Sequence, residues 1–189
     1  MSWQDEIDEI KQRRDLAKQQ GGEEGVAKHH AKGRQTIRER IGGLLDANSF
    51  DETGEGSGVP EYDEAGKLVD FQPANFVLGF GKIAGRKVIV GGEDFTVKGG
   101  SPNPAGLRKS VYAEQLALQY KLPLIRLHEG GGGSVGGTGQ EKNRRPLGDP
   151  VFATSRFVPL AQTLGAVPVA TAALGPVAGL PAARLVASH

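Results

Sequence analysis

Two glycine-rich loops constrain this chain most, because each follows a short apolar segment and precedes a helix-like one. The first runs from Leu127 to Ser134 with glycine at 130–133, and the second runs from Leu174 to Leu180. Glycine lets the backbone turn tightly and approach a ligand closely. N–H groups beside a helix N-terminus favour negative charge, and a pair aimed at one point forms an oxyanion hole. The alternative interpretation is a set of loose surface loops.

The order of hydrophobic segments predicts a layered α/β unit. Helices are expected at 2–20, 23–31, from Thr36, at 106–120 and 150–164, and from Pro181. Strands are expected at 76–83, 87–90, 122–127 and 167–173, with a loop or edge hairpin at 51–66 and a loop at 174–179. The chain stops at His189 within or just after its last predicted helix. We therefore expect a unit that is cut short, exposes apolar surface and is incomplete for activity alone.

Helix caps support two of these predictions. Ser2 and Asp5 have the spacing of a capping box for the first helix, whose apolar stripe needs a packing partner. Thr36 and Glu39 have the same spacing at the start of the third helix. The apolar residues expected on these two helices are Trp3, Ile7 and Ile10, and Ile37, Ile41, Leu44 and Leu45.

Composition excludes several classes of function. The chain has no cysteine, which excludes disulfides, thiolate metal sites and cysteine nucleophiles. Its formal net charge of +1 gives no reason to expect nucleic acid. No apolar run is long enough to span a bilayer, and no secretory signal is recognisable. We expect a cytoplasmic protein that binds neither nucleic acid nor membrane.

An oxyanion hole without a side-chain nucleophile suits the enolate of a thioester. Removing a proton or a carboxylate next to the thioester places charge on the carbonyl oxygen, where backbone donors stabilise it. A phosphate cradle is the rival interpretation. Neither loop is followed by Gly-Lys-Ser/Thr, and the acidic partner of a dinucleotide site is missing. The loops therefore favour a site that stabilises a thioester enolate.

Four stretches in the same order resemble the carboxyltransferase (beta) subunits of biotin-dependent acyl-CoA carboxylases, such as those for propionyl-CoA and methylcrotonoyl-CoA. They are Thr36–Phe50, Asp94–Ser101, Leu122–Gly133 and Val167–Gly179. The resemblance covers nearly the whole chain. It implies a crotonase-like (ClpP-type) α/β superfold of ββα units. Residues 1–48 would form an N-terminal helical segment and 49–189 part of the carboxyltransferase N-domain.

The resemblance also implies an activity. The substrate is an acyl-CoA, and carboxybiotin, carried on a partner protein or domain, donates the carboxyl group; no metal is expected. The partners are a biotin carboxylase or biotin carrier subunit and further copies, paired N-domain to C-domain. Alternatives are a truncated, non-catalytic acyl-CoA-binding or dimerisation fragment, and a crotonase-type hydratase or isomerase. The last would need acid/base carboxylates, for which Glu129 is the only candidate.

Site residues follow from the matched motifs. Backbone oxyanion donors are expected at Gly132, Gly133, Gly179 and Leu180, and coenzyme A contacts at Lys98, Gly99, Gly100, Ser101 and Arg38. This sequence departs from the family motifs at two places. Glu129–Gly133 stand where the family has D-S-G-G-A, and Leu180 stands where the family has the second glycine of A-G-G. We expect the Leu180 side chain to narrow the pocket and alter the preference for acyl groups. We interpret His128 as a hydrogen-bonded neighbour of the loop, and Glu129 as a residue that caps or orients it.

Overall fold

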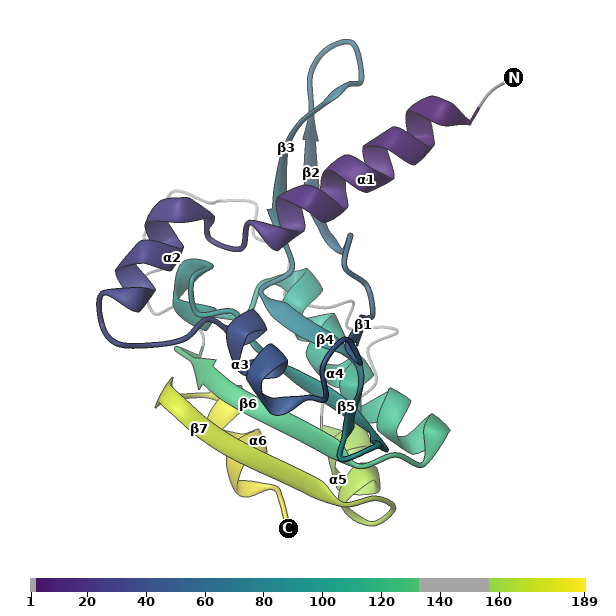
Figure 1. Cartoon of the computed structure of the whole chain (residues 1–189), viewed down its shortest axis with the longest axis vertical. Helices are drawn as coiled ribbons and strands as arrows, with labels where there is room; N and C mark the ends of the chain where they lie inside the picture. The colour runs from purple at the N-terminus through teal and green to yellow at the C-terminus, as the bar shows by residue number, and fades with distance from the viewer. Residues whose placement is uncertain (1–2, 133–156) are drawn as a thin grey trace.

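A five-stranded sheet forms the centre of the computed structural model, which describes residues 3–132 and 157–189. The strand order is β1 (Asp51–Glu52), β4 (Phe76–Ile83), β5 (Arg86–Glu93), β6 (Leu124–Gly130) and β7 (Val169–Val177). β1, β4 and β5 are antiparallel, whereas β5, β6 and β7 run parallel (Figure 1). The predicted hairpin and layered α/β unit are confirmed.

Successive side chains of a strand point to opposite faces of the sheet. Apolar side chains therefore lie on both faces, and helices cover each face. On one face, α4 (Pro104–Tyr120), α5 (Phe157–Leu164) and α6 (Leu180–Val186) lie behind the strands of Figure 1. The core there contains Phe76, Leu78, Ile89, Ala113, Leu116, Ala117, Leu124, Val167 and Val169. On the other face α3 (Ile37–Leu44) contributes to a core of Ile37, Ile41, Leu45, Val77, Val88, Val90 and Leu127.

The first helix, α1 (Gln4–Lys18), lies along a separate hairpin of β2 (Gly58–Tyr62) and β3 (Leu68–Pro73) (Figure 1). Arg13 and Glu9 both contact the Tyr62 hydroxyl, which donates to Glu9 over 2.8 Å. Trp3, Ile7 and Ile10 remain exposed. The N-cap of α1 is Trp3, which makes no side-chain capping bond, and the predicted cap Ser2 lies outside the described residues.

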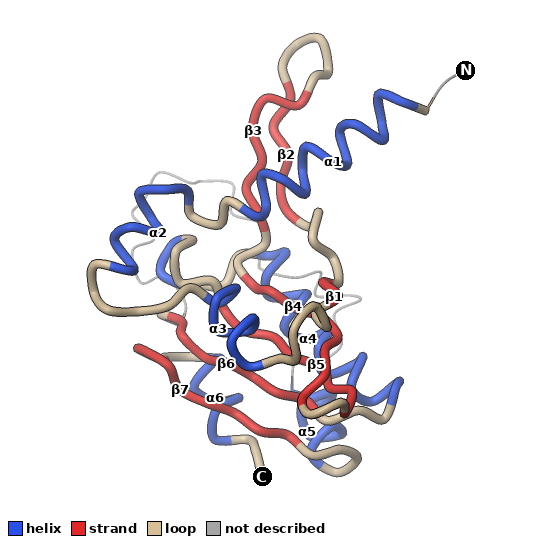
Figure 2. The backbone as a smooth tube through the Cα atoms, viewed as in Figure 1, coloured by secondary structure: helices blue, strands red, loops and turns tan. Residues whose placement is uncertain are grey.

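The edge of the sheet at β7 differs from the prediction. Residues 174–177 were expected in a loop, but they continue β7, and Val177 pairs with Gly130 beyond a register shift in β6. The ladder to β6 supplies backbone partners that extend a strand past the apolar run (Figure 2). The predicted helix at 23–31 is confirmed as α2 (Gly22–His30). The second part of the helix predicted at 150–164 is α5, and residues 150–156 lie outside the described residues.

Replacing Thr36 by Ala should weaken α3, because the predicted capping box is present. The Thr36 side chain accepts from the Glu39 N–H, and Glu39 Oε2 accepts from the Thr36 N–H over 2.7 Å. We expect Thr36→Ala to lower the free energy of unfolding by about 1 kcal/mol in urea denaturation. Thr36→Ser, which keeps the hydroxyl, should stay close to wild type. Equal stabilities for the Ala and Ser variants would contradict the cap.

Candidate functional site

Backbone hydrogen bonds join the two glycine-rich loops to a third segment after β5. The third segment is η1 (Lys98–Gly100), a short 3-10 turn. The Gly131 N–H donates to Gly99 O over 3.0 Å, and the Ala178 N–H donates to Gly130 O over 2.9 Å. These bonds bring three segments that are far apart in sequence to the carboxyl ends of β5, β6 and β7.

The close approach of these segments requires glycine at two positions. Gly100 has φ +65°, and a Cβ there would lie 2.6 Å from the Glu129 carbonyl oxygen. Gly132 has φ +59°, and a Cβ there would lie 3.0 Å from the Ala178 carbonyl oxygen. Positive φ is costly for other residues, and these distances leave no room for a side chain. Ser101 adds a further link by donating its hydroxyl to Gly132 O over 2.8 Å.

The structure brings together three of the four predicted oxyanion donors. Gly132 and Gly179 are adjacent, since a Cβ on Gly132 would lie 3.2 Å from the Gly179 Cα, and Leu180 follows as the first residue of α6. Within residues 3–132 and 157–189, the N–H groups of Gly132, Gly179 and Leu180 donate to no other described group. Gly133 lies outside the described residues.

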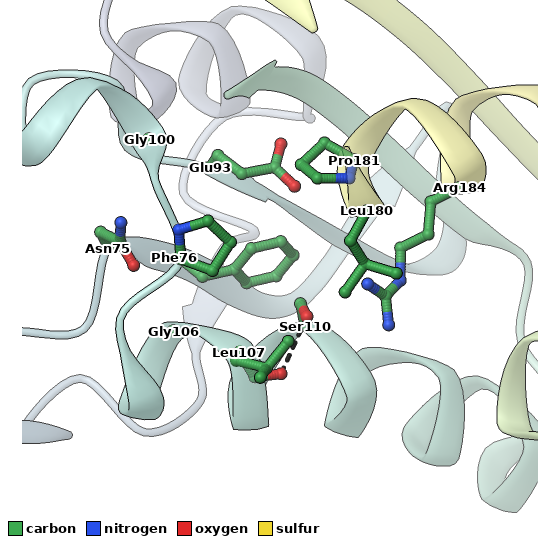
Figure 3. A pocket seen from close by; sticks show the side chains of 11 residues that line it. Asn75, Phe76, Glu93, Gly100, Gly106, Leu107, Ser110, Leu180, Pro181 and Arg184 are labelled. Carbon is green, nitrogen blue, oxygen red and sulfur yellow. Dashed lines mark hydrogen bonds between the residues drawn. The ribbon is translucent and has the colours of Figure 1, made fainter. Parts of the chain in front are cut away.

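A small pocket lies beside the second glycine loop (Figure 3). Its lining residues are Asn75, Phe76, Glu93, Gly100, Pro102, Gly106, Leu107, Ser110, Leu180, Pro181 and Arg184. The open space is about 10 Å³, close to that of one water molecule. Leu180 and Arg184 line the pocket from α6, and Leu180 is the residue that departs from the family's A-G-G.

Behind the pocket, a carboxylate holds two buried guanidinium groups. Glu114 Oε1 lies 2.7 Å from Arg126 Nη2 and 2.9 Å from Arg184 Nε. All three side chains are at most 2% exposed. Burial lowers the pKa of Arg126 to about 10, and the attraction of Glu114 opposes that shift. This network was not predicted from the sequence. The signal that could have revealed it is the presence of charged residues within otherwise apolar segments of a helix and a strand.

His128 and Glu93 form a second buried polar pair. His128 Nδ1 lies 3.1 Å from Glu93 Oε2, and the same carboxylate accepts from the Glu129 N–H over 3.4 Å. His128 is fully buried. The pair therefore links the end of β5 to the end of β6, which agrees with the interpretation of His128 as a hydrogen-bonded neighbour of the loop.

Glu129 is fully buried and faces basic side chains from α2, α3 and the segment between them. Arg40 Nη1 lies 2.5 Å from Oε2, Arg34 Nη1 lies 3.1 Å from Oε1, and His29 Nε2 lies 3.5 Å from Oε2. The Arg40 contact is an ion pair outside hydrogen-bond geometry. Glu129 is also not among the residues that line the pocket. These contacts favour an orienting role for Glu129 over that of a general base.

The predicted coenzyme A residues are only partly brought together. Lys98, Gly99, Gly100 and Ser101 form the turn beside the glycine loops, with Lys98 exposed. Arg38 instead makes a two-pronged contact with Glu52, at 2.6 and 3.2 Å. Lys109 lies 3.6 Å from the same carboxylate, and burial lowers the pKa of Lys109. The sequence could not reveal that Arg38 has this partner on β1.

Comparison with known proteins identifies the class. The family model described as "Carboxyl transferase domain" matches residues 28–180, so the chain belongs to the carboxyl transferase domain family. One relative, a propionyl-CoA carboxylase carboxyltransferase subunit from Haloferax mediterranei, is 30% identical over 95% of this chain and 33% of its own length. A probable biotin-dependent acyl-CoA carboxylase beta2 subunit from Mycobacterium tuberculosis is 39% identical over 68% of this chain and 23% of its own.

Solved structures share the fold. The transcarboxylase 12S structure, with methylmalonyl-coenzyme A and methylmalonic acid bound, aligns with a TM-score of 0.73 at 27% identity, over 96% of this chain and 34% of its own. A single-chain, multi-domain long-chain acyl-CoA carboxylase aligns with a TM-score of 0.74 at 26% identity, over 97% of this chain and 19% of its own. The crotonase-like fold is confirmed, and the chain spans about a third or less of these relatives (33% for the first).

Metal-binding clusters and membrane-spanning helices are both absent from residues 3–132 and 157–189. No group of three or more His, Asp or Glu side chains there is arranged to hold a metal ion. None of the helices there has the length and apolar character that a bilayer crossing demands.

Replacing Glu114 should strongly destabilise the fold, because two guanidinium groups would stay buried without a counter-charge. We expect Glu114→Ala to lower the free energy of unfolding by about 3–5 kcal/mol, measured by urea denaturation. Glu61→Ala, at an exposed position on β2, is the control and should change it by less than about 0.5 kcal/mol. Similar stabilities for the two variants would mean that the guanidinium groups find other compensation.

Proposed function

We propose that this chain is the acyl-CoA-binding part of a biotin-dependent carboxyltransferase. The observation that carries the proposal is the meeting of the two glycine loops, where Gly132 lies against Gly179 and the N–H groups of Gly132, Gly179 and Leu180 have no described acceptor. The transferred group would pass from carboxybiotin to the α-carbon of the acyl group. The names of the relatives, which are acyl-CoA carboxylase and carboxyltransferase subunits, support the same activity.

The backbone supplies the catalytic contribution of this chain. When the α-carbon proton passes to a base, a role that we assign to none of the described residues, negative charge would develop on the thioester oxygen, and preorganised N–H donors would stabilise that charge. Each donor contributes about 3 kcal/mol in comparable sites. Gly132, Gly179 and Leu180 are the donors among the described residues, and Gly133 is proposed with them. The glycine contacts at Gly100 and Gly132 fix the loops before substrate arrives, which lowers the cost of reorganisation.

Coenzyme A would lie along the turn after β5. Lys98 offers an exposed cation for its phosphates, and Gly99, Gly100 and Ser101 form the adjoining wall. Arg38 is proposed to contribute charge at the edge of this channel while it holds Glu52. The side chain of Leu180 narrows the space beside the second glycine loop, and we propose that it disfavours long acyl groups.

The cofactor and the partners belong to the same proposal. Carboxybiotin supplies the carboxyl group when a biotin carboxylase or carrier subunit presents it, and we assign none of the described residues to biotin. Residues 1–48 would form the helical segment and 49–189 part of the N-domain, which would pair with the C-domain of another copy of the subunit in the cytoplasm.

Isothermal titration with propionyl-CoA, acetyl-CoA and free coenzyme A tests the proposal. We expect micromolar binding of the acyl-CoAs by the wild type. Gly132→Ala should weaken it at least about tenfold, equivalent to about 1.4 kcal/mol, because the new methyl group would press on Ala178. Gly66→Ala is the matched control, since Gly66 also has positive φ but has open space around it. A folded wild type that binds none of the three ligands would overturn the proposal.

Shortening Leu180 should shift acyl preference. Leu180→Ala opens the pocket, so the affinity for butanoyl-CoA relative to acetyl-CoA should rise about fourfold for each methylene that becomes buried, or about 0.8 kcal/mol. The same titration measures this ratio. Leu174→Ala removes a half-exposed leucine from β7 outside the pocket and should leave the ratio unchanged. An unchanged ratio in Leu180→Ala would place the acyl group elsewhere.

A further inference from the structure

We infer that Arg40 is a positioning residue that ties the two glycine loops to one another. The inference rests on the proposed function for its consequence, since the loops carry the proposed donors. Arg40 belongs to α3, on the face of the sheet opposite α4 and the pocket. It therefore acts on the loops through other groups and does not line the pocket.

The guanidinium of Arg40 contacts both strands that lead into the loops. Its Nη1 lies 2.5 Å from Glu129 Oε2, and its Nη2 donates to the Leu174 carbonyl oxygen over 3.1 Å. Glu129 directly precedes Gly130 in the first loop, and Leu174 begins the last part of β7 before the second. One planar, rigid group with two prongs thus fixes the spacing between the ends of β6 and β7.

The carboxylate of Glu129 extends this coupling across the gap between the strands. A Cβ on Gly175 would lie 2.3 Å from Glu129 Oε1, so the carboxylate lies directly against the β7 backbone. The Glu129 side chain is 1% exposed. A shift of this buried charge away from Arg40 would therefore disturb β7 as well as the first loop.

Arg34 and His29 contact the same carboxylate but do not duplicate Arg40. Arg34 donates to Oε1 over 3.1 Å with its side chain 30% exposed, whereas the side chain of Arg40 is 9% exposed. Neither Arg34 nor His29 makes a described contact with Leu174. Arg34 thus supports one loop, and Arg40 joins two.

This coupling matters because an oxyanion hole depends on donor position. The proposed donors belong to different loops, so their separation is set by whatever holds β6 and β7 together at this end. A misplacement of about 1 Å can reduce catalysis about a hundredfold. Arg40 is thereby placed to control the geometry of the site from the far face of the sheet.

Amide hydrogen exchange of the full chain, with propionyl-CoA titration, tests the inference. In Arg40→Met we expect faster exchange in both 130–132 and 174–180, and propionyl-CoA affinity at least tenfold weaker. Arg40→Lys keeps the charge beside Glu129 but lacks the fork, so it should restore slow exchange in 130–132 and leave 174–180 fast. Arg34→Met should leave 174–180 at its wild-type rate.

A control separates this coupling from general loss of stability. Ile41→Val removes a buried methyl group from the same helix without touching either loop. If Arg40→Met exchanges like Ile41→Val in the two segments, or like wild type, the inference is overturned. Should Arg40→Met fail to fold, Arg40→Lys decides: slow exchange in 174–180 overturns the inference. A wild type that binds no acyl-CoA would instead overturn the proposed function, while the exchange rates would still decide the coupling.

Discussion

The parallel pairing of β5, β6 and β7 is the constraint on which the rest of this structure depends. In that ladder Gly92 pairs with Leu127, and Leu127 pairs with Ala172, so the three strands end at one edge of the sheet. The segments that follow the three strands therefore meet at that edge and contact one another. Glycines then allow backbone to contact backbone, and the loop bonds from Gly131 and Ala178 complete the arrangement.

Buried charge is concentrated around the same edge of the sheet. Glu114 holds Arg126 and Arg184 on one face, and Glu129 holds Arg40 and Arg34 near the other. Desolvation makes such pairs poor sources of stability, because the cost of removing two charges from water is close to the attraction gained. Their value here lies in geometry, since each joins a helix to a strand next to the loops and disfavours other arrangements.

Local patterns in the sequence predicted much of the fold. The capping box at Thr36 and the β4–β5 hairpin depend on neighbours within a few residues, and both were confirmed. One prediction failed because a long-range contact decided the outcome. The extent of β7 was set by its ladder to β6, which continues the strand through residues 174–177.

The sequence by itself determined the two glycine loops, their placement after apolar strands and the family to which the chain belongs. These depend on residue types at fixed local spacing. Only the tertiary structure decided which charges meet. Arg40 and Leu174 are 134 positions apart, and Arg34 and Glu129 are 95 apart. Local sequence patterns do not reveal contacts between residues so far apart. The partners of Arg40 are fixed only when α3 packs on the sheet and brings this arginine to the ends of β6 and β7.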